Sequence, residues 1–209
     1  MSGKKTGIVL LVFFLILGGV FLGYHLYEIK QQPKGLSVFG NPGHKVGAFS
    51  FTNQDGQTIT DKDVAGKIRV VEYFFTTCKS ICPRLNENLS KVYTAYKGNN
   101  DVLFLSHTVD PEHDTVNALK EYSRRFEADS HQWEFLTGSK QKLYDMARYE
   151  YLISAQDDTT GVPITQDFIH DNHYSLVDRD GRIRGFYDGL KTDEVQKLIK
   201  DIDELLKEK

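Results

Sequence analysis

Residues 70–83 read VVEYFFTTCKSICP and contain both cysteines of the chain. The first six residues are mostly β-branched or aromatic, which indicates a buried strand. From Leu85 onward apolar residues recur at helical spacing, so we expect a helix over about residues 83–97. Pro83 suits the first helical position and disfavours helical backbone at the preceding residue, which makes Cys82 the expected N-cap. Both thiols are therefore expected in a strand-to-helix loop, where the helix dipole favours thiolates.

The rest of the pattern predicts a sheet that carries this loop. A second apolar strand is expected at 102–105, so that strand, helix and strand form a parallel β-α-β unit. The other predicted elements are a hairpin turning at Asp55-Gly56, a helix to about 126 with Asp114 as N-cap, a strand at 133–136, a helix from Ser139 to about 149, a brief strand at 151–153, a hairpin of 173–177 and 183–187, and an amphipathic helix at 192–207. This order predicts an α/β fold, a thioredoxin-like mixed sheet flanked by helices.

An apolar segment opens the chain. Residues 8–23 are uncharged and almost wholly apolar, and with their neighbours they approach the ~20 residues that span a bilayer. Two lysines precede this run, which fits either a cleaved signal peptide or an uncleaved anchor, and the lack of a small-x-small cleavage site favours the anchor. We expect a transmembrane anchor at 1–27, a tether at 28–45 and one thioredoxin-like domain at 46–209. The positive-inside rule then places the domain on the extracytoplasmic, periplasmic-type side.

Charge and cysteine content narrow the possible functions. The net charge of -3 and the absence of a long basic run give no indication of nucleic-acid binding. In an exported domain, two cysteines separated by three residues form either a structural disulfide, a redox pair or a metal site. A disulfide across so short a loop would remove little entropy from the unfolded chain. A redox or metal-binding role is therefore favoured.

Three motifs in this order resemble the Sco/SenC family of copper proteins: FFTTCKSICP at 74–83, VDPEHDT at 109–115, and LVDRDG at 176–181 after a histidine. The resemblance covers about residues 46–207. It implies a membrane-anchored thioredoxin fold that binds copper, as Cu(I) or Cu(II), through both cysteines and one distant histidine. It also implies a metallochaperone that helps to assemble the dinuclear copper centre of cytochrome c oxidase, with the copper-bearing oxidase subunit as partner. A thiol-disulfide oxidoreductase is the alternative.

The resemblance implies Cys78 and Cys82 as copper ligands and places the third ligand eleven residues before Gly181, at His170. Two thiolates and an imidazole form a soft set that suits Cu(I) and is acceptable to Cu(II), whereas structural zinc sites usually have four protein ligands. His173 is the alternative ligand, otherwise interpreted as the first residue of a strand. The remaining histidines of the domain are predicted at the surface or at strand ends: His107, His113 and His131.

Two other activities share the cysteine pair. In an oxidoreductase, Cys78 would attack a partner disulfide and Cys82 would resolve the mixed disulfide, although thioredoxins separate this pair by two residues rather than three. A thiol peroxidase would need a threonine and an arginine beside one activated cysteine. Thr77 and Arg84 are present, but the complete motif is absent. Asp110 matches a family aspartate near the metal loop, where it would accept hydrogen bonds or steer a cationic partner; the alternative is a turn-forming residue before Pro111.

Overall fold

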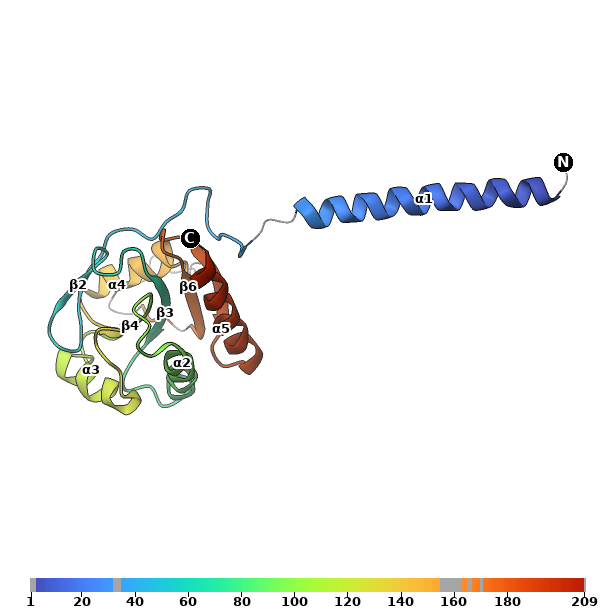
Figure 1. The fold of residues 1–209 in the computed structure, drawn as a ribbon. Helices are drawn as coiled ribbons and strands as arrows, with labels where there is room; N and C mark the ends of the chain where they lie inside the picture. Colours follow the sequence, from blue (N-terminus) through green and yellow to red (C-terminus); the bar gives the residue numbers. More distant parts are fainter. Residues whose placement is uncertain (1–2, 32–34, 155–162, 165–166, 170, 209) are drawn as a thin grey trace. The chain divides into compact units, whose positions relative to one another are not determined.

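The computed structural model describes residues 3–31, 35–154, 163–164, 167–169 and 171–208. The chain forms two compact units, Met1–Lys34 and Gly35–Lys209. The first unit contains helix α1, Gly3–Gln31 (Figure 1). Within α1 the stretch Gly7–His25 has a mean hydropathy of 2.6 and is long and apolar enough to cross a membrane.

The second unit contains a five-stranded sheet. Its strands are β3 Ile68–Phe74, β4 Val102–Thr108, β5 Trp133–Leu136, β6 His173–Val177 and β7 Ile183–Asp188. They lie in the order β5-β4-β3-β6-β7. β4 is parallel to both β3 and β5, whereas β6 is antiparallel to both β3 and β7. The sheet is therefore mixed, and the predicted β-α-β unit and C-terminal hairpin are both confirmed.

Helices and a small hairpin cover the two faces of this sheet. The remaining elements are β1 Ser50–Thr52, β2 Thr58–Thr60, α2 Cys82–Tyr96, α3 Val116–Ser123, a 3-10 turn Arg124–Phe126, α4 Lys140–Asp145, a π-helix Met146–Glu150 and α5 Thr192–Lys207. The buried side chains of α2, α3 and α5 form one hydrophobic core on one face. The β1–β2 hairpin, α4 and the π-helix form a second core on the other face. Figure 1 shows α2 and α5 beside the sheet and α4 near the β1–β2 hairpin.

This double cover explains the sequence of the central strands. Every residue of β3 and β4 is buried, as expected for strands that pack on both faces and read as nearly continuous apolar runs. Helix α5 has the predicted bounds and buries one stripe of side chains: Val195, Leu198, Ile202 and Leu205. The fold is thus the predicted thioredoxin-like α/β architecture.

The segment after the π-helix is not the predicted brief strand. The N–H of Tyr151 donates to the carbonyl of Met146 at 2.8 Å, and the N–H of Ile153 donates to the carbonyl of Ala147 at 2.7 Å. The backbone groups therefore bond back to the preceding helix rather than to a neighbouring strand. The apolar side chains that suggested a strand are buried in the second core instead.

Part of the predicted tether packs on the domain. The N–H of Phe39 donates to the carbonyl of Ile183, and the N–H of Val46 donates to that of Gly181, both at 2.9 Å. The rings of Phe39 and Phe186 lie edge to face with centroids 5.4 Å apart. Phe39 of the predicted tether therefore adds an apolar contact and a hydrogen bond to β7, and Val46, the first residue of the predicted domain, bonds to the turn before β7.

Candidate metal centre

The two cysteines lie where β3 leads into α2. Cys78 is half-buried in the loop after β3, and Cys82 is buried at the start of α2. Both are free thiols. The N–H of Cys82 donates to Sγ of Cys78 at 3.4 Å. The chain therefore presents two sulfur atoms together at the positive end of a helix dipole, a setting that favours thiolates.

The sequence predicts that Cys82 is the N-cap of α2, but in the structure Cys82 is the first residue of the helix. The N-cap is Ile81, whose backbone is already helical with φ -87 and ψ -36. Pro83 therefore takes the second helical position. Its missing N–H does no harm there either, because the first N–H groups of a helix have no acceptor within the helix. The Cys82 N–H finds its acceptor in the Cys78 sulfur, which is why the helix can begin one residue earlier.

The two thiols differ in acidity. Burial of Cys78 Sγ raises its pKa, but hydrogen bonds from Cys82 and Ser80 outweigh burial, so that this pKa lies below its ordinary value. Burial raises the pKa of Cys82 to about 12, and the neighbouring Cys78 side chain adds to the rise. Cys78 is consequently the thiol that is more easily deprotonated and more accessible, and Cys82 is the protected one.

A buried carboxylate braces the cysteine loop. Asp114 is completely buried and accepts hydrogen bonds from the backbone N–H of Thr76 at 3.2 Å and from the hydroxyls of Thr76 and Thr108. The prediction that Asp114 is the N-cap of α3 is therefore wrong. Thr115 caps that helix, with its hydroxyl accepting from the N–H of Ala118. Asp114 instead ties the loop after β3 to the end of β4.

A small cavity of about 70 Å³ opens at the cysteines. Cys78 and Cys82 line it together with aromatic side chains from the end of β3 and with Val109. Ile169 and Asp171 line it from a distant part of the sequence. The residues on either side of position 170 thus reach the same cavity as both sulfurs. His170 itself lies outside the described residues.

The alternative ligand His173 has another contact. It is the first residue of β6, is exposed, and its Nδ1 lies 2.8 Å from Oδ1 of Asp171. It does not line the cysteine cavity. Among the residues that the structure describes, no group of three His, Cys, Asp or Glu side chains is placed to hold a metal ion. A three-ligand site at the cysteines would therefore need a side chain outside this set.

The other histidines of the domain fall into two classes. His113 and His131 are exposed, as predicted, and Nδ1 of His113 lies 2.9 Å from the carboxylate of Asp110. His107 is not at the surface: it is completely buried in β4 and stacks on Tyr73 with ring centroids 5.1 Å apart. Burial lowers the pKa of His107 to about 3, so that its ring is neutral. His107 therefore lies at a strand end, as one of the two predicted positions, and aromatic side chains distant in sequence enclose it there.

Asp110 forms the turn before α3. Its carbonyl accepts from the N–H groups of His113 and Asp114 at 3.1 and 2.8 Å. It does not line the cysteine cavity. The turn interpretation of this residue is therefore the one that the geometry supports.

Glu72 is a buried acid that the sequence reasoning overlooked. It lies in the middle of β3, is completely buried, and accepts a hydrogen bond from the Ser106 hydroxyl at 2.6 Å. Burial raises its pKa to about 8. Its negative charge, when present, also raises the pKa of Cys82. The available signal was an acidic residue between the apolar pairs Val70-Val71 and Tyr73-Phe74 of this strand.

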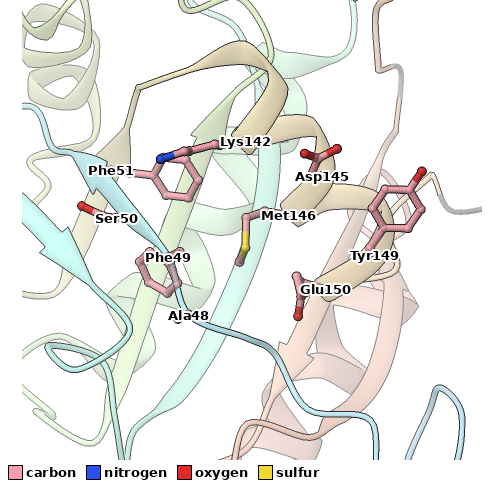
Figure 2. Close-up of a pocket in the computed structure, with 9 residues that line it drawn as sticks. All are labelled: Ala48, Phe49, Ser50, Phe51, Lys142, Asp145, Met146, Tyr149 and Glu150. Atoms are coloured by element: carbon pink, nitrogen blue, oxygen red, sulfur yellow. The ribbon is translucent and has the colours of Figure 1, made fainter.

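A larger cavity, of about 480 Å³, lies elsewhere on the domain, between β1 and the end of α4 (Figure 2). Phe49, Phe51 and Met146 line it, with Lys142 and Glu150 among its polar residues. These three apolar side chains are already 93% or more buried, because their exposed fractions are only 7%, 3% and 6%. Among the described residues that line this cavity there is no cysteine or histidine. We therefore place the chemistry at the smaller cavity with the cysteines.

Comparison with known proteins shows the family of this chain. The SCO1/SenC family profile matches residues 40–207. The SCO1 protein homolog of Bacillus subtilis (strain 168) is 28% identical over 161 residues, which cover 76% of this chain and 81% of that protein. The crystal structure of a SCO1/SenC family lipoprotein from Bacillus anthracis str. Ames is 28% identical, with a TM-score of 0.65, and the match covers 84% of this chain and 98% of that one.

A relative has been solved with metal. The structure of Bradyrhizobium japonicum ScoI with copper bound is 26% identical, with a TM-score of 0.58, and the match covers 75% of this chain and 98% of that one. The family profile spans nearly the whole second unit, including the cysteine loop, the Asp110 turn and the C-terminal hairpin. The chain belongs to the SCO1/SenC family.

Proposed function

We propose that this protein is a copper metallochaperone, which binds copper through Cys78, Cys82 and His170 and delivers it to the copper-bearing subunit of cytochrome c oxidase. The observation that carries the proposal is that Ile169 and Asp171, the neighbours of position 170, line the same cavity as both sulfurs. Copper bound to a 26% identical relative of the same fold supports the choice of metal. The role in oxidase assembly is the one that the family resemblance implies.

The donor set agrees with copper as cargo. Thiolate sulfur selects soft ions such as Cu(I), and imidazole suits both copper oxidation states. The lowered pKa of Cys78 makes its thiolate more readily available than that of an ordinary cysteine, while bound metal would favour loss of the proton from Cys82. Besides the two cysteines, Ser80 and Asp171, the cavity is lined by aromatic and aliphatic side chains.

We also propose that α1 anchors the protein in a membrane. Its apolar stretch Gly7–His25 has the length and composition for one crossing. Lys4 and Lys5 precede this stretch, so the positive-inside rule keeps the N-terminus in the cytoplasm and the metal centre on the extracytoplasmic side. A cysteine-reactive reagent that does not cross membranes should therefore label the protein in intact cells.

Copper titration of the reduced full-length chain in detergent tests the ligand set. The expected result is about one copper per chain, with a Cu(II) absorption and electron paramagnetic resonance spectrum that shows sulfur and nitrogen ligands. Cys78→Ser, Cys82→Ser and His170→Ala should each weaken binding and change the spectrum. His131→Ala is the matched control and should leave both unchanged, because His131 is exposed and does not line the cysteine cavity. Wild-type affinity and spectrum in His170→Ala would refute the assignment of the third ligand.

The second candidate is a thiol-disulfide oxidoreductase, and the unequal acidity of the two thiols favours it. The Cys78 thiolate would attack a partner disulfide and release one partner thiol. Cys82 would then lose its proton and displace the second thiol, so that the partner gains two electrons and Cys78 and Cys82 form a disulfide. This activity needs both cysteines but predicts that His170→Ala still reduces partner disulfides.

The peroxidase alternative has no comparable support. Thr77 and Arg84 are both exposed and neither lines the cysteine cavity.

A further inference from the structure

Asp171 stands out among the residues of the cysteine cavity because it is the centre of a hydrogen-bond cluster. Its Oδ1 accepts from the backbone N–H of His173 at 2.7 Å and lies 2.8 Å from His173 Nδ1. Its Oδ2 accepts from the backbone N–H and the hydroxyl of Ser154, both at 3.2 Å. Only 16% of the Asp171 side chain is exposed. One carboxylate thus joins two segments of the chain.

Both segments are themselves fixed to the domain. Ser154 follows Ile153, whose side chain is 2% exposed and whose N–H donates to the carbonyl of Ala147. His173 begins β6 and pairs with Asp188 of β7. Asp171 therefore connects the end of the π-helix region to the start of a sheet strand.

The backbone beside this contact is strained. Leu152 and Ser154 have φ angles of 55° and 52°, in the left-handed region that side chains with a Cβ rarely adopt. Such conformations persist where the surrounding structure holds them, and they cluster at ligand-binding sites. The two hydrogen bonds from Ser154 to Asp171 supply part of that hold. The strain indicates that the contact between Ser154 and Asp171 has a role in addition to packing.

We propose that Asp171 positions His170 for copper, an inference that rests on the proposed function. Position 170 lies between Ile169, which is 3% exposed, and Asp171, and both of these neighbours line the cavity with the sulfurs. The hydrogen bonds of Asp171 fix the backbone immediately after position 170. Groups that orient a metal ligand in this way typically change metal affinity by about 10- to 100-fold when they are removed. Asp171 acts through its neighbour and is not itself a ligand in this proposal.

The test uses copper affinity, measured by competition with a Cu(I) chelator, on the full-length chain in detergent. Asp171→Ala should bind copper about 10- to 100-fold more weakly and shift the Cu(II) paramagnetic resonance spectrum. Asp171→Asn keeps one acceptor oxygen and should recover part of the loss. The matched control is Asp63→Ala, because Asp63 likewise accepts from the N–H and hydroxyl of one residue, Thr60, but lies outside the cavity lining. It should leave copper binding unchanged.

A double-mutant cycle separates positioning from a general structural effect. If Asp171 acts through His170, adding Asp171→Ala to His170→Ala should weaken copper binding by no more than about twofold, since coupled residues are not additive. Amide hydrogen exchange at Ser154 and His173 provides a readout without copper, and both amides should exchange faster in Asp171→Ala.

Each opposite result overturns the proposal. Additive losses in the cycle would show that Asp171 acts independently of His170. Faster amide exchange with unchanged copper affinity would show a contact that does not position the ligand, and unchanged exchange would show that the contact is unimportant. Failure of the proposed function is distinguishable, because Cys78→Ser would then bind copper as well as wild type does.

Discussion

Replacing Glu72 by Gln should remove a pH dependence of stability that this one buried acid creates. The carboxyl group is completely buried in β3 and accepts from Ser106 at 2.6 Å, while its Oε2 has no hydrogen-bond partner within the described residues. Burial raises its pKa from the ordinary 4.5 to about 8, and the Ser106 hydrogen bond opposes only part of this rise. Between these two values the native state holds a proton that the unfolded chain has lost.

The sign and size of the effect follow from this difference. Because the native state binds the extra proton, the free energy of unfolding is highest below the unfolded pKa and falls as the pH rises toward the folded pKa. At about 1.4 kcal/mol for each pH unit, the decline amounts to about 5 kcal/mol in total and about 4 kcal/mol between pH 5 and pH 8. Gln keeps the shape and can accept from Ser106 but does not titrate. Glu72→Gln should therefore gain stability relative to wild type by about 4 kcal/mol over this interval.

The assay is urea unfolding of the reduced, metal-free protein at pH 5, 6, 7 and 8. Trp133 is the single tryptophan, is completely buried, and its Nε1 donates to the same Ser106 hydroxyl, so its fluorescence reports on this core directly. The control is Glu87→Gln on the exposed side of α2, whose stability should track that of wild type at every pH. A constant difference between Glu72→Gln and wild type from pH 5 to pH 8 would refute the reasoning, because Glu72 would then be ionised in the native state.

Three further predictions concern the cysteine loop and the packing behind it. Iodoacetamide at pH 7 should modify Cys78 much faster than Cys82, because Cys78 is the more acidic and more exposed thiol; mass spectrometry gives both rates, and equal rates would contradict the assignment. Asp114→Ala should lower the free energy of unfolding by about 1–3 kcal/mol, since it leaves the buried donors of two threonines without an acceptor; a thermal unfolding temperature equal to that of wild type would show that the brace is dispensable. Gly189→Ala should cost about 1–3 kcal/mol, since its Cβ would overlap the buried side chains of Leu85 and Tyr174 and force them to move; unchanged urea unfolding would mean that these side chains rearrange freely.

Several helices, strands and turns could be predicted from the sequence, because the residue pattern that indicates each of them lies within that element. The apolar run before the cysteines, the helical spacing after them and the Asp-Gly turns predict β3, α2 and both hairpins, and α5 begins and ends where its apolar stripe does. These features depend on hydrophobic period and turn chemistry, which neighbouring residues specify without help from the rest of the chain. The cysteine motif likewise predicts that the two thiols lie at the start of a helix.

The burial and the hydrogen-bond partners of several side chains could be known only from the folded chain, because they depend on segments that are distant in the sequence. Asp114 has the sequence context of a helix cap, yet it braces Thr76, 38 positions away, because the ends of parallel strands β3 and β4 lie side by side. His107 lies at a strand end, but its complete burial comes from aromatic side chains of other elements that enclose it. The contact between Ser154 and Asp171 also joins residues that no local pattern relates. Burial and hydrogen-bond partners are properties of the packed chain, and for this reason the hydrophobic periodicity of the sequence does not predict them.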